Sequence, residues 1–147
     1  MSSQALVLTP DQQARALNVV GMQIKVLASN VDTQSFGITL QEGPEGAGPP
    51  LHRHGWDEAF YVLKGAVNFQ CDGDRIVCAA GTLVHVPCGT FHGFSFGQGG
   101  GSMLEISGAG ANAAPFFTAI HNEIPAGPPN IPKLLELARQ HGVEFAV

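Results

Sequence analysis

The sequence predicts an all-β fold, either a sandwich or a barrel, and three features lead to this prediction. Short apolar runs with strand-like spacing follow one another closely between residues 22 and 107. Turn residues separate these runs, and glycine supplies 19 of the 147 residues, about twice its usual share. The segment 42–50, rich in glycine and proline, suits a loop and neither a helix nor a central strand. Many short strands joined by tight turns are typical of sandwiches and barrels rather than of repeating β-α units.

The first expected strand is Met22–Ala28, in which apolar residues alternate with Gln23 and Lys25 at a period of two. Gly65, Gly81 and the glycine-rich run 97–101 are expected to act as turns between later strands. Those strands are expected at Ser35–Leu40, His52–His54, Glu58–Leu63, Ala66–Cys71, Arg75–Cys78, Leu83–Val86, His92–Phe96 and Met103–Ser107.

Helices are expected only near the two ends of the chain. A T-P-x-Q pattern that begins at Thr9 has the features of a capping box at the start of a short helix. A second short helix is expected to begin at Pro115. In the C-terminal tail an apolar stripe containing Leu134 and Leu137 predicts a further helix, and Gly142 is placed to end it.

The chain is expected to form one domain over residues 1–147, because its length is usual for a single domain and no internal repeat is present. The expected parts are an N-terminal arm (1–21), a core barrel (about 22–108) and a C-terminal helical tail (115–147).

The charge content excludes several classes of partner. The seven Lys and Arg residues are scattered singly and the net charge is −5, so no basic stripe is available for nucleic acid or an anionic membrane. No apolar run is long enough to cross a bilayer. Only 13% of the residues are charged, against about 25% in ordinary domains, which indicates apolar surface buried in a ligand cavity or a dimer interface.

Cysteine usage and the N-terminus indicate the compartment. The chain has three cysteines, an odd number, and no C-x-x-C motif, so a disulfide framework is not expected. The first fifteen residues contain neither a basic region nor a long apolar run of the kind found in signal peptides. A cytoplasmic location is expected.

Two short patterns place possible metal ligands close together. His52 and His54 are two residues apart, so on a strand both point to the same face, and Glu58 is a further even step away. His92 follows a Pro-x-Gly turn that returns the chain. Each fragment alone also suits a plain alternative: exposed histidines on an edge strand, a solvated acid, or a turn histidine. Together, imidazoles and a carboxylate suit a divalent Fe, Ni, Mn, Co, Cu or Zn ion.

The spacing of these residues resembles the two motifs of the cupin family. The first motif, G(X)5HXH(X)3–4E(X)6G, is matched at every fixed position by Gly46, His52, His54, Glu58 and Gly65. The second motif, G(X)5PXG(X)2H(X)3N, is matched by Gly81, Pro87, Gly89 and His92, whereas Phe96 stands where the family usually has Asn. The resemblance implies a double-stranded β-helix, or jelly-roll barrel, with a C-terminal helix. It also implies one divalent transition metal held inside by His52, His54, Glu58 and His92. Cupins commonly dimerise, and the low charge content agrees with a buried interface, so a homodimer is expected.

Strand alternation from the expected ligands predicts the lining of the barrel. Counting in twos from Glu58 places Phe60 and Val62 inside, and counting from His92 places Phe94 and Phe96 inside. An apolar interior beside a metal favours a small apolar or aromatic substrate over a sugar or nucleotide.

Three functions fit this reading. The first is a mononuclear metal-dependent dioxygenase, quercetinase-like, that acts on a small aromatic or enol-type substrate. The runs 114–117 and 142–145 resemble tail segments of quercetin-dioxygenase-like cupins. The second is a non-redox metal-dependent lyase, cyclase or isomerase, and in either enzyme Glu58 is the expected general base. The third is a non-catalytic module that binds a small molecule.

Overall fold

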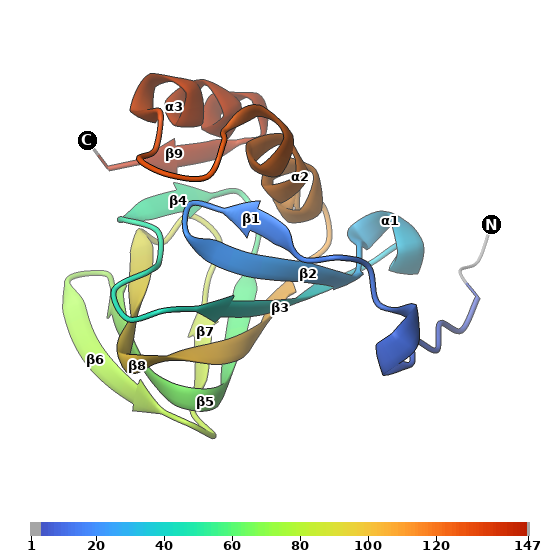
Figure 1. Cartoon of the computed structure of the whole chain (residues 1–147), viewed down its shortest axis with the longest axis horizontal. Coiled ribbons are helices and arrows are strands. Elements are labelled where there is room, and N and C mark those ends of the chain that lie inside the picture. The colour runs from blue at the N-terminus through green and yellow to red at the C-terminus, as the bar shows by residue number, and fades with distance from the viewer. Residues whose placement is uncertain (1–3, 147) are drawn as a thin grey trace.

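The structure, a computed structural model, describes residues 4–146, and the first three residues of the expected N-terminal arm lie outside this range (Figure 1). Antiparallel strands curl around an apolar core, and the expected all-β jelly-roll fold with a C-terminal helix is confirmed. The elements are a 3-10 turn (Pro10–Gln12), β1 (Leu17–Val19), β2 (Met22–Ala28), α1 (Asn30–Thr33), β3 (Gly37–Gly43), β4 (His52–His54), β5 (Glu58–Cys71), β6 (Asp74–Ala79), β7 (Leu83–Val86), β8 (His92–Ser107), α2 (Ala113–Glu123), α3 (Ile131–Gln140) and β9 (Val143–Phe145).

Two long strands, β5 and β8, hold the barrel together. They pair antiparallel over most of their length, with Phe60 opposite Glu105 and Phe69 opposite Phe94. On one side β8 continues the sheet through β3, β2 and β1, and on the other side β5 pairs with β6 and β7. Because each long strand bends, its two halves contribute to different walls of the barrel (Figure 1).

The expectation that glycines would divide these long strands was wrong. Residues 58–63 and 66–71 form the single strand β5, and residues 92–96 and 103–107 form the single strand β8. At Gly65 the pairing shifts register instead of ending. A Cβ atom at Gly65 would lie 2.3 Å from the carbonyl oxygen of Gly100, and Gly65 has a φ of 72°. Glycine therefore allows the two strands to bend against each other at close range.

The sequence reasoning missed three short elements: β1, α1 and β9. The strand β9 is the most important, because it pairs with β4 and places Phe145 opposite His52 and Val143 opposite His54. The C-terminal tail therefore supports the strand that carries two possible metal ligands.

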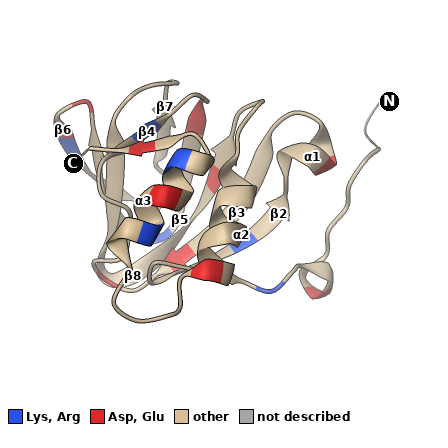
Figure 2. Cartoon of the chain, turned by 90° about the horizontal axis from the view of Figure 1, so that it is seen from above, with Lys and Arg blue, Asp and Glu red and all other residues tan. Residues whose placement is uncertain are grey.

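The helices α2 and α3 lie over one end of the barrel (Figure 1). Asn130 caps α3 by accepting a hydrogen bond from the backbone N–H of Lys133 at 3.1 Å. Leu134 and Leu137 of α3 are buried, and Figure 2 shows basic and acidic bands alternating along its outer side. Within residues 4–146, none of the helices has both the length and the hydropathy needed to span a bilayer.

The outer face of the sheet is unusually apolar. Across β7, β5, β8 and β3, Tyr61 pairs with Leu83 and with Leu104, and Leu104 pairs with Leu40. Leu83 is 62% exposed and Tyr61 is 42% exposed. An antiparallel sheet that faces water normally carries polar residues on that side. The homodimer stays a prediction, and this face is where we expect a second copy to bind.

Replacing Leu83 with Glu is expected to convert the predicted dimer to a monomer, because the new charge would be buried without a partner. Sedimentation velocity over a concentration series would measure the change. Val77→Glu is a matched control, since Val77 is 74% exposed on β6 and lies outside the row of paired residues. A wild-type chain that stays monomeric at high concentration would contradict the prediction.

Candidate metal centre

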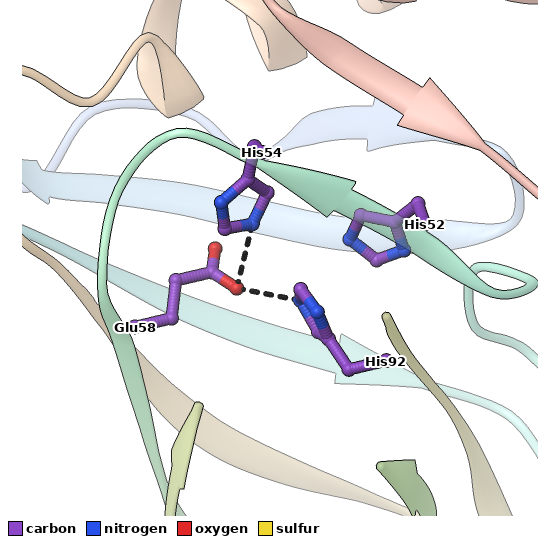
Figure 3. Close-up of side chains that lie close together, drawn as sticks. All are labelled: His52, His54, Glu58 and His92. Atoms are coloured by element: carbon purple, nitrogen blue, oxygen red, sulfur yellow. Dashed lines mark hydrogen bonds and ion pairs between the residues drawn. The ribbon is translucent and has the colours of Figure 1, made fainter. Parts of the chain in front are cut away.

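Four side chains from three strands point toward one another at the helix-covered end of the barrel (Figure 3). His52 and His54 come from β4, Glu58 from the start of β5 and His92 from the start of β8. Their possible ligand atoms all lie within 4.8 Å of one another. His54, Glu58 and His92 are buried, and His52 is partly exposed. The motif residues that the sequence singled out are therefore brought together by the fold.

Pairing and turn contacts explain this convergence. His52 lies directly opposite His92, since β4 pairs with β8 there. The turn that precedes His92 is attached to the turn between β4 and β5. Cys88 donates its backbone N–H to Asp57 at 2.7 Å, and Gly89 donates to the carbonyl oxygen of His54 at 2.9 Å. Asp57, which is not itself a ligand candidate, thus fixes the two motifs relative to each other.

All three imidazoles are held in the same way. The Nδ1 atoms of His52, His54 and His92 lie 2.9, 3.1 and 2.8 Å from the backbone carbonyl oxygens of Pro50, Trp56 and Thr90. A carbonyl oxygen only accepts hydrogen bonds, so each Nδ1 donates its hydrogen and Nε2 is the ring nitrogen left for the interior. This arrangement fits metal ligation through Nε2.

The charges also suit a cation. Burial and the neighbouring His92 lower the pKa of His52 to about 4, so this ring is neutral at pH 7 and available as a ligand. Burial alone would raise the pKa of Glu58, but contacts from His54 and His92 lower it below its usual value. Glu58 Oε2 lies 3.0 Å from His54 Nε2 and 2.9 Å from His92 Nε2. Imidazole nitrogens and an ionised carboxylate form a donor set that could hold a divalent transition metal.

Trp56, the only tryptophan in the chain, supports this centre from the side. Its indole ring stacks on the His54 ring at 4.1 Å between centroids with 7° between planes. Its carbonyl oxygen accepts the Nδ1 hydrogen bond of the same histidine. Trp56 therefore fixes both the rotation and the tilt of His54.

Because Trp56 contacts a ligand ring, we expect Cu²⁺, Ni²⁺ or Co²⁺ to quench most of its fluorescence with a stoichiometry of one ion per chain. Zn²⁺, which has a filled d shell, is expected to quench little but to compete with the other ions. A fluorescence titration of chelator-treated protein would test both effects. Unchanged emission at saturating Cu²⁺ would contradict this expectation.

A cavity of about 70 Å³ adjoins the cluster. Its walls are almost entirely apolar and come from the barrel and the C-terminal tail, with Phe60, Phe94, Phe116, Ile120, Leu134 and Phe145 among them. The free volume is small, which favours a small substrate over a multi-ring compound.

The predicted lining residues separate into two groups. Phe60 and Phe94 line the cavity, whereas Val62 and Phe96 are not among its lining residues. Both are fully buried in the core, because alternation predicts which face a side chain occupies but not how deep it lies. Phe96, at the position where cupins usually have Asn, packs against Gly43, whose added Cβ would lie 2.6 Å from the Phe96 ring.

The sequence reasoning missed a polar wall of the barrel formed by Thr39, Gln41 and Glu105. All three are buried, and Thr39 and Glu105 lie opposite each other on β3 and β8. Glu105 accepts hydrogen bonds from Gln41 Nε2 at 3.0 Å and from Thr39 Oγ1 at 3.3 Å. Burial, together with the charge and hydrogen bond of nearby Glu58, raises the pKa of Glu105 well above its usual value. The pKa values of two neighbouring buried carboxyl groups, Glu58 and Glu105, are thus displaced in opposite directions.

The comparisons with known proteins agree with this geometry. Residues 39–105 match the family described as Cupin domain. The chain contains a cupin domain. A curated relative, Quercetin 2,3-dioxygenase of Bacillus subtilis (strain 168), is 31% identical over 115 residues, which are 78% of this cupin and 31% of the relative. This cupin therefore spans about a third of that protein.

Solved structures share the fold. KdgF from Halomonas sp. superposes with a TM-score of 0.68 at 18% identity, covering 76% of this cupin and 99% of that chain. The polyketide cyclase RemF from Streptomyces resistomycificus superposes with a TM-score of 0.62 at 20% identity, covering 72% of this cupin and 80% of that chain. At these identities the likeness concerns the fold and not the reaction.

Proposed function

We propose that this cupin is a mononuclear metal-dependent dioxygenase that acts on a small single-ring aromatic or enol-type substrate. The observation that carries the proposal is the position of the His52, His54, Glu58 and His92 cluster beside an apolar cavity. The 31% identity to a quercetin dioxygenase supports the reaction class. The free volume of about 70 Å³ favours a substrate with fewer rings than quercetin.

The residues of the chain have distinct roles in this proposal. His52, His54 and His92 would hold the ion through Nε2, and Glu58 would complete the set. When bound, the ion supplies Lewis acidity and, if it is redox-active, a partner for dioxygen. The Glu58 carboxylate takes the proton from the substrate hydroxyl, because it is ionised and adjoins the cavity. Phe60, Phe94 and the C-terminal tail exclude water from the substrate ring.

Oxygen-electrode measurements on a panel of single-ring phenols, catechols and enols would test this function. The protein would be loaded separately with Fe²⁺, Mn²⁺, Co²⁺, Ni²⁺, Cu²⁺ or Zn²⁺. We expect substrate-dependent oxygen uptake with at least one redox-active ion, and a loss of about a hundredfold or more in Glu58→Gln. No uptake with any ion and substrate would overturn the proposal.

A non-redox reaction of the lyase, cyclase or isomerase type is a second candidate, and the Glu58–Glu105 pair favours it. An ionised and a protonated carboxyl in one interior are the arrangement that acid-base catalysis needs. Glu58 would take a proton from the substrate and Glu105 would return one. Turnover that persists without oxygen in the Zn²⁺-loaded protein would support this candidate and exclude the oxygenase.

A further inference from the structure

Three buried side-chain polar atoms have no hydrogen-bond partner among the described residues, and one of them, Nε2 of His54, belongs to the candidate metal cluster. The other two are Oε1 of Gln41 and Nε1 of Trp56. Gln41 is 1% exposed and Trp56 is 6% exposed, and both residues line the cavity. Leaving such an atom unpaired is costly in free energy, so buried polar groups in folded proteins normally have hydrogen-bond partners. One atom is an acceptor and the other is a donor.

The orientation of the Gln41 amide is fixed by its neighbours. Its Nε2 donates to Glu105 Oε2 at 3.0 Å and to Thr39 Oγ1 at 3.3 Å. The Thr39 hydroxyl donates its hydrogen to Glu105 and can only accept from Gln41, so the NH₂ group of Gln41 faces these two residues. The Oε1 atom is therefore left for a partner that the chain itself does not provide.

The Trp56 side chain is equally constrained. Its ring lies against His54 and its far edge approaches Gly142, whose added Cβ would lie 3.8 Å from it. These contacts keep the indole in place, and its N–H remains without an acceptor among residues 4–146. The cavity is otherwise lined by aromatic and aliphatic side chains apart from the metal cluster and Glu105.

We propose that the cavity recognises a single-ring hydroxy-carbonyl compound, whose O–H group donates to Gln41 Oε1 and whose carbonyl oxygen accepts from Trp56 Nε1. The inference extends the proposed function, because it names the two substrate groups that orient the ring beside the metal cluster. It makes Gln41 and Trp56 specificity-determining residues. The apolar walls bind the ring, and the two polar atoms select among rings of similar size.

Two pairs of probes of closely matched shape separate these contacts. Phenol and fluorobenzene differ in the O–H donor, and benzaldehyde and styrene differ in the carbonyl acceptor. Isothermal titration calorimetry on the full chain, freed of metal with a chelator, would measure the four dissociation constants. We expect the wild type to bind phenol about tenfold more tightly than fluorobenzene, and benzaldehyde about tenfold more tightly than styrene. This is the effect of one satisfied buried hydrogen bond.

Each variant serves as the control for the other. Gln41→Met should abolish the preference for phenol and keep the preference for benzaldehyde, and Trp56→Phe should do the reverse. Circular dichroism would show that both variants are folded. Equal preferences in wild type and variants, or no binding of any probe to the wild type, would overturn the inference.

A preference for phenol that appears only in metal-loaded protein would also overturn the inference, because the hydroxyl would then contact the ion and not Gln41. Since these measurements use no oxygen and no turnover, they can succeed when the oxygen-uptake assay fails. They can equally fail when that assay succeeds.

Discussion

Replacing both His54 and His92 with alanine is expected to weaken metal binding by far more than a hundredfold, so that the purified protein retains almost no ion. Replacing a residue that only hydrogen-bonds to a metal ligand commonly lowers metal affinity ten- to a hundredfold, and here two ligands themselves are lost. Elemental analysis of protein purified without a histidine tag would measure the ion content. The control is His85→Ala, because His85 is exposed on β7 and lies outside the cluster.

The same double substitution is expected to destabilise the metal-free protein. Glu58 is 5% exposed and loses both imidazoles that now contact it, so its buried carboxylate loses both of its ion-pair contacts. Breaking a buried pair in this way costs about 3–5 kcal/mol. Thermal unfolding in the presence of a chelator would show the lower midpoint. Full metal content in the folded double variant would contradict the assignment of the site.

The metal ligand candidates could be predicted from the sequence because they depend on short-range spacing. His52 and His54 share a face of any regular strand, and the cupin-like spacing supplied Glu58 and His92. The residues that hold these side chains in place come from distant parts of the sequence. Phe145 reaches His52 through the pairing of β9 with β4, across more than ninety residues of chain, and nothing in the tail sequence indicates that pairing.

The polar wall was missed because alternation changes parity inside β8. His92, Phe94 and Phe96 face inward at even positions, whereas Met103 and Glu105 face inward at odd positions. The glycine-rich run between them bends the strand and shifts the register, so counting in twos from His92 places Glu105 outside. Such a shift depends on close contact with the partner strand, as at Gly65, and not on the sequence of β8 alone.

Glu105, in the polar wall, is expected to make the free energy of unfolding depend strongly on pH. Glu105 has a raised pKa in the folded chain, so between its unfolded and folded pKa values the folded state holds a proton that the unfolded state has released. The unfolded state then binds fewer protons, and the free energy of unfolding must fall as pH rises. This contribution changes by up to about 1.4 kcal/mol per pH unit. The pKa of Glu58 is shifted in the opposite direction, so Glu58 affects the free energy of unfolding at lower pH. Glu58 is present in both the wild type and the Glu105→Gln variant.

Glu105→Gln removes this ionisation and keeps groups that can hydrogen-bond to Glu58, Thr39 and Gln41. We therefore expect the variant to gain stability relative to the wild type as pH rises from 5 to 8, because the neutral amide has no proton to lose. Urea unfolding of chelator-treated protein at each pH would give the difference in free energy. Glu45→Gln, which alters an exposed acid, should leave that difference constant. If the free energies of unfolding of Glu105→Gln and the wild type changed in parallel with pH, Glu105 would be ionised in the folded chain. The barrel interior would then hold two negative charges, on Glu58 and Glu105.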